Sequence, residues 1–320
     1  MTTEQSQVIA DQAPRYTQDD LEAWRKEGGV LIPQFFNAEE VAAVTPDFHA
    51  VFGTPESRAS ADALNRKQPG QVGEFDPTQF SGFDNIPLPC SPALNLIGLH
   101  PALIQLAQAA LGTEKVHIYQ CQAWAKFTGE SDYDQPFHCD FANHTLTVPS
   151  EEDRLNSITI LCYFSDVTDA HGPMNYVPRS ISDQIAGPER SLGASEDQEL
   201  QDALRQHARS SASPAGSIFA YGIDVYHRGT NLVEPKGYRH AVMACYKVAG
   251  NDIIGYCAWP WHHKKPWNIV FENASPQQLS CLGVPLPGHP FWNETTLRRA
   301  QVRWPGWDMT PYRDALERTQ

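Results

Sequence analysis

The chain has 320 residues, of which 41% are hydrophobic and 19% charged, enough apolar material for a substantial core. Its formal net charge is -14, from 38 acidic and 24 basic residues. This balance argues against nucleic acid as the main partner, because nucleic-acid-binding surfaces carry clustered Lys and Arg. No run approaches about 18 consecutive apolar residues, so we expect no membrane span.

The N-terminal residues 1–14 form a polar segment, which we expect to be a disordered tail. It lacks the basic and apolar stretches of a signal peptide. The chain has seven cysteines, an odd number, with no C-x-x-C pair, so neither a disulfide framework nor a structural zinc site is indicated. Reduced thiols are typical of the cytoplasm, which is therefore the expected location.

The N-terminal third of the chain is predicted to be mainly helical. One helix has Thr17 as its N-cap and stops at Gly28, and a second has Asn37 as its N-cap. Residues 53–92 are rich in Pro, Gly, Asp and Ser without a sustained period. We expect them to form a long irregular segment, which in a compact domain often covers a site. The regular elements expected here are helices at 17–29, 37–52 and 91–112 and a strand at 30–36.

From residue 115 the pattern changes to short β-rich runs without alternating helices, which predicts an antiparallel sandwich or barrel. A polar, helical insert is expected at 195–211. The last 65 residues hold six of the eight tryptophans and are expected to cover the barrel, a lid or dimer contact being the alternative. We therefore expect one domain at 15–320, with a β core at about 115–250 and a C-terminal cover at 251–320. The expected strands are 115–127, 138–141, 157–167, 216–222 and 238–248.

A candidate metal site begins in the run PFHCDF, which contains His138 and Asp140. On a strand, residues two apart point to the same face, so the two side chains can meet one ion. His227, between two turns, supplies a third ligand. Two histidines and one carboxylate form the facial triad of non-haem Fe(II) oxygenases, which leaves positions open for a cosubstrate and dioxygen. In the simpler interpretation, the aspartate only orients its neighbouring histidine.

An arginine follows the last candidate ligand by twelve residues, in the run GYRHAVMACYKV. On a strand Arg239 shares a face with Ala241, Met243 and Cys245, a set suited to a barrel interior, whereas His240 faces the other way. A buried arginine needs an anionic partner, because an unpaired buried charge costs several kcal/mol. The distal carboxylate of 2-oxoglutarate is one such partner. An exposed position, or an ion pair with an acidic residue, is the alternative.

Weaker candidates lie beside these residues. On the strand at 115–127, alternate positions face one way and form either a pocket wall that touches the 2-oxo acid or the solvent side; they are Gln120, Gln122, Trp124 and Lys126, of which Lys126 is also a candidate for substrate contact. Phe141 and Asn143 follow the metal motif and are candidates for contact with substrate, and His144 is an alternative between substrate contact and loop packing. The run HHKK at 262–265 is interpreted as a surface turn.

Taken together, these motifs resemble the phytanoyl-CoA dioxygenase (PhyH-like) family of Fe(II)/2-oxoglutarate-dependent oxygenases. The likeness begins at YTQDDLEAWRKEGGVLIPQFFNAEEVAAV and continues through AKFTGESDYDQPFHCD, YFSDVTDAHGPMNYVPRS and GSIFAYGIDVYHRGTNL to YRHAVMACY. The resemblance implies a double-stranded β-helix (jelly-roll, cupin-like) core. It also implies that His138, Asp140 and His227 hold Fe(II), that Arg239 binds 2-oxoglutarate, and that dioxygen is consumed.

The sequence departs from the family pattern at two places. The chain reads VPRSIS where relatives read approximately PGSH, so Arg179 stands at an edge of the expected active site and is a candidate for substrate contact. Gly229 stands where relatives often have serine, and Thr230 is the expected replacement hydroxyl near the cosubstrate, with Gln122 as a further cosubstrate candidate. Halogenating relatives lack the carboxylate of Asp140, so its presence favours hydroxylation, desaturation or ring closure.

The expected function is therefore an Fe(II)- and 2-oxoglutarate-dependent dioxygenase that hydroxylates an unactivated C–H bond of a small organic metabolite and releases succinate and CO2. One alternative is a cupin-like metal enzyme that does not use 2-oxoglutarate, and another is a non-catalytic binding or sensor protein on the same scaffold. A small-molecule substrate is the only partner expected, with neither nucleic acid nor membrane.

Overall fold

The computed structural model describes residues 13–58, 83–129, 134–145, 156–187, 197–254 and 265–318. Nearly all of the expected N-terminal tail lies outside these ranges, as do much of the irregular segment at 53–92 and most of the HHKK run. The described elements cover the expected β core, the N-terminal helices and most of the C-terminal region.

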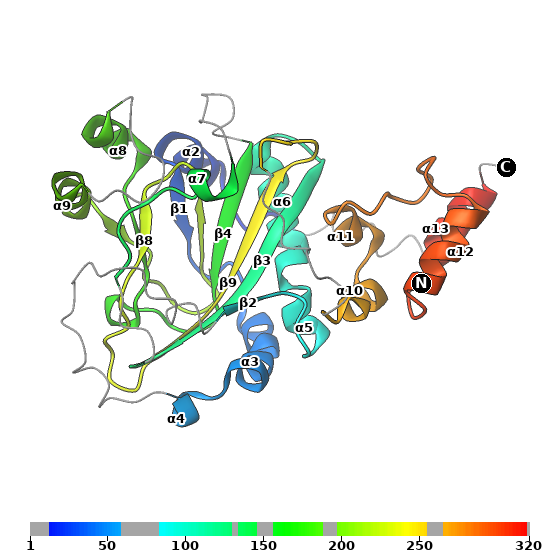
Figure 1. The fold of residues 1–320 in the computed structure, drawn as a ribbon, viewed down its shortest axis with the longest axis horizontal. Helices are drawn as coiled ribbons and strands as arrows, with labels where there is room; N and C mark the ends of the chain where they lie inside the picture. Colours follow the sequence, from blue (N-terminus) through cyan, green and yellow to red (C-terminus); the bar gives the residue numbers. More distant parts are fainter. Residues whose placement is uncertain are drawn as a thin grey trace.

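Two antiparallel sheets form the centre of the molecule, and Figure 1 shows the long strands β3 and β9 crossing it side by side. The larger sheet has the strand order β1-β7-β4-β9-β3-β2, and the smaller has the order β6-β5-β8. The smaller sheet packs on the larger one, where the Tyr176 and Phe219 rings lie 4.5 Å apart. This arrangement confirms the expected mainly β fold and is consistent with a double-stranded β-helix. The strands are β1 (Gly29–Ile32), β2 (Phe83–Asn85), β3 (Val116–Phe127), β4 (Ser157–Tyr163), β5 (Met174–Tyr176), β6 (Arg209–Ser210), β7 (Ile218–Tyr221), β8 (His227–Gly229) and β9 (Tyr238–Val248).

Cross-strand pairing in the larger sheet places side chains in rows, because directly opposed residues of antiparallel strands point to the same face. The face toward the smaller sheet is here called the inner face. One row aligns Gln120, Cys245, Thr159 and Tyr221, and the last row pairs Lys126 with Arg239. A register shift between Ile118 and Gln120 sets this alignment. The prediction that Arg239 shares a face with Ala241, Met243 and Cys245 is confirmed by these pairings, which also include Gln122 with Met243 and Trp124 with Ala241.

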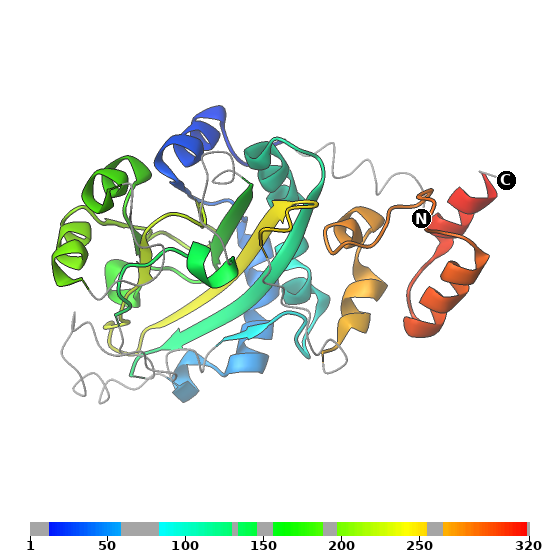
Figure 2. The same ribbon diagram turned by 45° about the horizontal axis from the view of Figure 1, so that its top comes forward.

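Helices cover the outer face of the larger sheet, as Figures 1 and 2 show for α3, α5 and α6. Their apolar side chains join outward-facing strand residues in the main hydrophobic core. His240 is fully buried on this face, stacked on Phe48 at 4.6 Å, as its opposite orientation to Arg239 predicts. The helices preceding β3 are α2 (Gln18–Glu27), α3 (Ala38–Phe52), α4 (Pro55–Arg58), α5 (Pro92–Asn95), the 3-10 helix η3 (Ile97–Leu99) and α6 (Pro101–Leu111).

The predicted caps explain where the N-terminal helices begin. The side chains of Thr17 and Asn37 each accept a hydrogen bond from the third helical N–H. In return, the Thr17 and Asn37 N–H groups donate to the carboxylates of Asp20 and Glu40, which completes a capping box in each helix. The prediction of one continuous helix at 91–112 is wrong, because the chain breaks between Asn95 and Pro101. Proline disfavours the α conformation in the residue before it and has no N–H to donate, so a new helix starts there.

Two further helices, α8 (Arg179–Ala186) and α9 (Gln198–Gln206), lie beyond the smaller sheet, and α9 confirms the expected helical insert. Short helices also occur near the site, as α7 (Phe141–His144), and before β5, as the 3-10 helix η5 (Asp169–His171). Within the described residues, no helix combines the length and the apolar character needed to cross a membrane.

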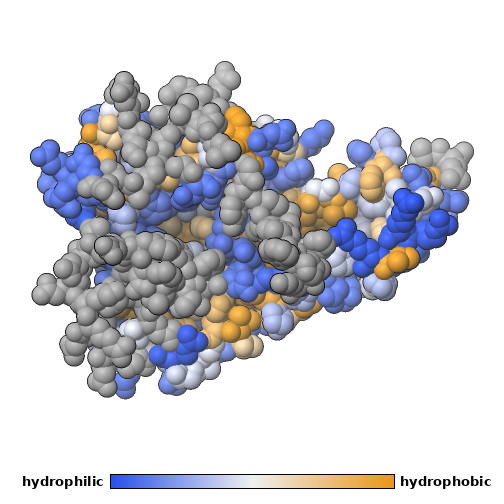
Figure 3. Space-filling view, viewed as in Figure 1, coloured by the Kyte–Doolittle hydropathy of each residue, from blue (hydrophilic) through white to orange (hydrophobic). Residues whose placement is uncertain are grey.

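The described residues 265–318 contain the helices α10 (Trp267–Asn273), α11 (Pro276–Ser280), α12 (Glu294–Arg303) and α13 (Thr310–Glu317). Helix α10 packs beside α5, whereas Figure 1 shows α12 and α13 farther from the sheets. Helices α12 and α13 form a hairpin, in which the rings of Trp292, Trp307 and Tyr312 contact one another edge to face. Figure 3 shows a largely hydrophilic surface on α9 and on the α12–α13 hairpin, with apolar surface near α11.

Candidate metal and cosubstrate site

An isolated antiparallel bridge brings the two candidate histidines together. The His138 N–H donates to the His227 carbonyl oxygen at 3.0 Å, and the His227 N–H donates to the His138 carbonyl oxygen at 2.9 Å. The prediction of a strand at 138–141 is wrong beyond this bridge. Asp140 has φ -69° and ψ -14° and precedes α7, so a turn, and not strand alternation, directs its carboxylate toward the histidines.

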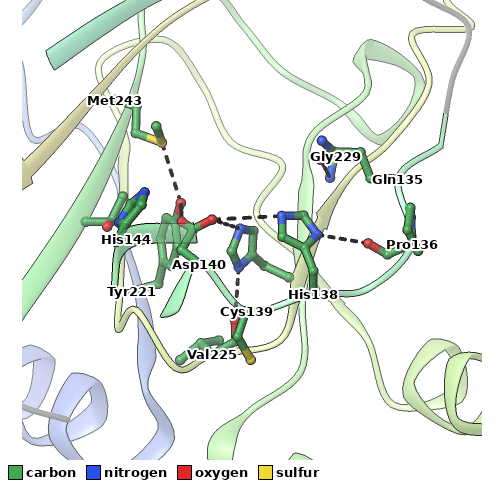
Figure 4. A network of polar contacts seen from close by, with 12 residues as sticks. Gln135, Pro136, His138, Cys139, Asp140, His144, Tyr221, Val225, Gly229 and Met243 are labelled. Carbon is green, nitrogen blue, oxygen red and sulfur yellow. Dashed lines mark hydrogen bonds and ion pairs between the residues drawn. The ribbon is translucent and has the colours of Figure 1, made fainter. Parts of the chain in front are cut away.

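The three candidate ligand side chains converge. Figure 4 shows the side chains of His138 and Asp140 lying close together. The Asp140 Oδ1 atom lies 3.9 Å from His138 Nε2 and 3.6 Å from His227 Nε2. One ligand atom from each of the three residues lies within 4.8 Å of the other two. Separations of this size leave room for a metal ion between the atoms. Zinc, another divalent transition metal, is bound by imidazole nitrogen and carboxylate oxygen at about 2.0–2.2 Å.

Main-chain contacts fix how each imidazole is presented. His138 Nδ1 lies 2.9 Å from the Pro136 carbonyl oxygen, and His227 Nδ1 lies 2.9 Å from the Val225 carbonyl oxygen. A carbonyl can only accept, so each Nδ1 carries the proton and each Nε2 presents a lone pair. Metal-binding histidines are oriented in this way by their second nitrogen. The donor set therefore fits a divalent transition metal.

Burial and neighbouring charges set the protonation states. Burial, assisted by the neighbouring His227, lowers the pKa of His138 to about 4, so its imidazole is neutral at pH 7. Burial alone raises the pKa of Asp140, but His227, His144 and His138 outweigh it, and the net direction is downward. The neutral imidazole of His138 and the ionised carboxylate of Asp140 are the forms that bind a metal ion.

Aromatic residues surround the carboxylate and were not singled out from the sequence. The Tyr221 hydroxyl donates to Asp140 Oδ2 at 3.4 Å, which leaves Oδ1 as the oxygen that faces the histidines. Tyr221 also contacts the Met243 sulfur at 3.6 Å (Figure 4). The Tyr119 hydroxyl lies 3.1 Å from His144 Nδ1, and both residues are buried. The alternation of GSIFAYG, which puts Tyr221 and Phe219 on one face, was the available signal for the first of these.

The last row of the inner face carries two cations, Lys126 and Arg239, which pair directly across β3 and β9. Both side chains are buried, so the interpretation of this strand face as solvent-exposed is wrong for Lys126 and for Gln120 and Gln122. Arg239 donates through Nη1 to the Gly172 carbonyl oxygen, and its buried Nε has no hydrogen-bond partner in the part of the chain that the structure describes. The arginine therefore retains donor capacity for a ligand.

The other candidate residues occupy different positions. Gln122 lies on the inner face opposite Met243, and Phe141 is buried beside Cys139 in a small core cluster. Asn143 is exposed. The Thr230 hydroxyl, expected near the cosubstrate, donates to the Pro173 carbonyl oxygen at 2.6 Å.

Arg179, the candidate for substrate contact at an edge of the expected active site, donates hydrogen bonds to acceptors within the protein. Its Nε and Nη2 donate to the two carboxylate oxygens of Asp224 at 3.0 and 2.8 Å, and its Nη1 donates to the Arg25 carbonyl oxygen at 2.9 Å. The ion pair is almost completely buried. Asp224 lies in the turn before His227, so Arg179 ties the end of α2 to the segment that carries a candidate ligand.

Comparison with protein families matches residues 24–241 to the model described as Phytanoyl-CoA dioxygenase (PhyH). The match spans both sheets and contains all three candidate ligands and Arg239. No curated protein sequence matches the chain.

Several solved structures share the fold. One is SnoK, described as a non-heme alpha-ketoglutarate-dependent carbocyclase from nogalamycin biosynthesis, at 18% identity, with 74% of this chain and 88% of that chain covered and a TM-score of 0.51. The epimerase SnoN in complex with Fe3+, alpha-ketoglutarate and nogalamycin RO matches at 16% identity, covering 72% and 83%, with a TM-score of 0.51. The apoform of EctD from S. alaskensis matches at 17% identity, covering 74% and 79%, with a TM-score of 0.54.

Proposed function

Because the chain belongs to the phytanoyl-CoA dioxygenase family, we propose that it hydroxylates an unactivated C–H bond of a small organic metabolite. As a member of this family it is an Fe(II)/2-oxoglutarate-dependent dioxygenase. In this proposal His138, Asp140 and His227 hold the iron, and Arg239 binds the distal carboxylate of 2-oxoglutarate. The observation that carries the assignment is the convergence of three ligand atoms within 4.8 Å, with both histidines presenting Nε2.

The residues around the metal site have different roles in the reaction. When bound, Fe(II) with 2-oxoglutarate and dioxygen supplies the oxidising power for removing hydrogen from a C–H bond, and the 2-oxo acid leaves as succinate and CO2. With only three protein ligands, a bound iron would keep positions for the cosubstrate and dioxygen. Tyr221 restrains the carboxylate of Asp140, and the main-chain bridge holds the two imidazoles at a fixed separation.

Hydroxylation, desaturation or ring closure is favoured over halogenation, because Asp140 supplies a carboxylate at the position that halogenating relatives leave open for a halide. The same fold supports other outcomes. SnoK is described as a carbocyclase, SnoN as an epimerase, and EctD has been crystallised with 2-oxoglutarate and 5-hydroxyectoine. Hydroxylation and ring closure both begin with removal of hydrogen from carbon. The metal ligands therefore do not distinguish these two reactions, and the identity of the product does.

Iron content and cosubstrate turnover test this function together. Purified protein reconstituted anaerobically is expected to bind one iron per chain and, on exposure to dioxygen, to convert 2-oxoglutarate to succinate. His138→Ala should lose both properties. His289→Ala is the matched control, because His289 is exposed in the C-terminal region and should keep both. Iron retained by the His138 variant would overturn the ligand assignment.

The product tests the finer proposal. A panel of small metabolites is screened for stimulated succinate release, and the product formed under 18O2 is analysed by mass. One added atom of 18O is expected. A product that has lost two hydrogens without gaining oxygen would replace hydroxylation by desaturation or ring closure.

A further inference from the structure

The turn that joins β7 to β8, residues 222–226 and here called the ligand turn, supplies hydrogen-bond acceptors to the metal site. The Ile223 carbonyl oxygen accepts the Phe141 N–H at 3.0 Å, and the Asp224 carbonyl oxygen accepts the Cys139 thiol at 3.1 Å. Cys139 and Phe141 are the direct sequence neighbours of the candidate ligand that lies between them. The ligand turn therefore contacts the chain on both sides of the ligand aspartate.

The ligand turn also orients the second arm of the metal site. The Val225 carbonyl oxygen accepts the proton of His227 Nδ1 at 2.9 Å, and the Tyr226 carbonyl oxygen accepts the Val177 N–H at 2.9 Å. Three successive carbonyl groups of the turn thus contact residues that are candidate ligands or their neighbours. A shift of the ligand turn would therefore change both the direction of the His227 imidazole and the position of the ligand aspartate.

The side chain of Asp224 fixes the ligand turn to another part of the fold. Both of its carboxylate oxygens accept from Arg179, from Nε at 3.0 Å and from Nη2 at 2.8 Å. The pair is buried, with 6% of the Arg179 side chain and 0% of the Asp224 side chain exposed. Two parallel hydrogen bonds between a guanidinium and a carboxylate fix both the distance and the plane of the pair.

The other side of the guanidinium is attached to the end of α2. Arg179 Nη1 donates to the Arg25 carbonyl oxygen at 2.9 Å, and the neighbouring Ser180 hydroxyl donates to the Glu27 carboxylate at 2.6 Å. The helix ends at Gly28, where an added Cβ would lie only 3.2 Å from the guanidinium carbon. Arg179 therefore connects the ligand turn to a helix that is capped at both ends.

The burial of this ion pair matters more for geometry than for stability. The loss of hydration of two buried charges offsets much of their attraction, so apolar residues of similar size often stabilise a fold equally well. A buried ion pair does specify an arrangement, because a shift of either partner breaks hydrogen bonds that water does not replace in a buried site. Arg179 and Asp224 apply this constraint between α2 and the ligand turn.

We propose that Arg179 and Asp224 are positioning residues of the metal site, which hold the ligand turn so that His227 Nε2 and the Asp140 carboxylate face the same ion. The inference rests on the function proposed above and adds to it two residues that are not among the three candidate ligands. It also gives a role to the arginine in VPRSIS, where the family pattern reads approximately PGSH. Arg179 acts on the metal site through the ligand turn.

Paired substitutions separate this role from a contribution to stability. Arg179→Met alone removes the donor to a buried carboxylate, whereas the double variant Arg179→Met/Asp224→Asn also removes the charge and keeps the shape of the aspartate. The Kd for Fe(II) is measured anaerobically by chelator competition, and urea unfolding is followed on the same samples. The Fe(II) Kd should rise at least about tenfold in the double variant, in the range found for groups that orient metal ligands. Its unfolding midpoint should lie above that of Arg179→Met, because the buried charge is gone.

Further variants and a second metal accompany this measurement. Arg179→Lys keeps the charge and can occupy part of the guanidinium position, so it should recover part of the lost affinity. Arg205→Met removes an arginine from a partly exposed pair with Asp202 on α9, and should leave the Fe(II) Kd unchanged. With Co(II) in place of Fe(II), the visible absorption reports how the ligands are arranged around the ion. The Co(II) spectrum of the double variant should differ from that of the wild-type protein.

The outcomes distinguish this inference from the proposed function. An unchanged Fe(II) Kd in the double variant would overturn the inference, because the ion pair would then contribute to stability without affecting the metal site. An equal loss of affinity in Arg205→Met would also overturn it, since the effect would not be specific to the ligand turn. Both results leave the proposed function intact. If the wild-type protein itself binds no iron, the proposed function fails, and the positioning role fails with it.

Discussion

Substitution of Arg239 by alanine is the sharpest test of where the cosubstrate binds. Arg239 is 5% exposed, its guanidinium donates to the Gly172 carbonyl oxygen, and its buried Nε has no hydrogen-bond partner among the described residues. A carboxylate bound by two of its N–H groups gains two charge-assisted hydrogen bonds, each worth about 1.5 kcal/mol at the lower end of the usual range. The lower end applies because Lys126 remains to attract the ligand. The sum, about 3 kcal/mol, corresponds to a rise in Kd of about 100-fold.

Anaerobic titration of the iron-loaded variant measures this change, through the visible charge-transfer absorption that a 2-oxo acid produces when it chelates Fe(II). Iron binding should remain at one per chain, since Arg239 is not one of the three candidate ligands. Arg313→Met removes the same charge from α13 and should leave the titration unchanged. A Kd for 2-oxoglutarate within about threefold of wild type would refute the assignment of Arg239 to the cosubstrate.

Three further outcomes are expected. Tyr221→Phe should weaken iron binding about tenfold in a chelator competition, because it removes the hydroxyl that orients the Asp140 carboxylate. An unchanged affinity for iron would show that this hydrogen bond does not contribute to iron binding. Arg179→Met should lower the free energy of unfolding by about 3–5 kcal/mol in urea, because the buried carboxylate of Asp224 loses both hydrogen bonds from the guanidinium, whereas Arg205→Met, in a partly exposed pair, should cost less than about 1 kcal/mol. Binding of 2-oxoglutarate should take up protons, because the bound anion raises the lowered pKa of Lys126. The affinity for 2-oxoglutarate should therefore be highest below the pKa that Lys126 has in the free protein, and should fall as the pH rises through the pKa that Lys126 has in the complex. Lys126→Met should abolish this slope in calorimetry, and a slope that survives would assign the protons to another group.

Local sequence patterns identified the chemistry of the site before any tertiary information. The spacing of His138, Asp140 and His227 predicted a facial triad, and the period of two in YRHAVMACYKV placed Arg239 on the inner face and His240 on the outer face. Helix caps at Thr17 and Asn37 were equally readable, because a side chain that satisfies an N–H three residues away acts within one turn.

Other features depended on contacts between distant segments. Asp140 was expected on a strand, but it lies in a turn that follows the bridge between His138 and His227, and this turn directs its carboxylate. The break before Pro101 was missed because the apolar period continues through it.

What the sequence by itself determined is the set of donor groups and their order along the chain, since residue type and short-range period fix which chemistry is available and which face each strand residue shares. Only the tertiary structure decided which groups meet. The register shift after Ile118 aligns Lys126 with Arg239, and a shift of one residue would turn the lysine to the opposite face. That register is chosen by packing and pairing across more than a hundred residues, and no local pattern encodes it.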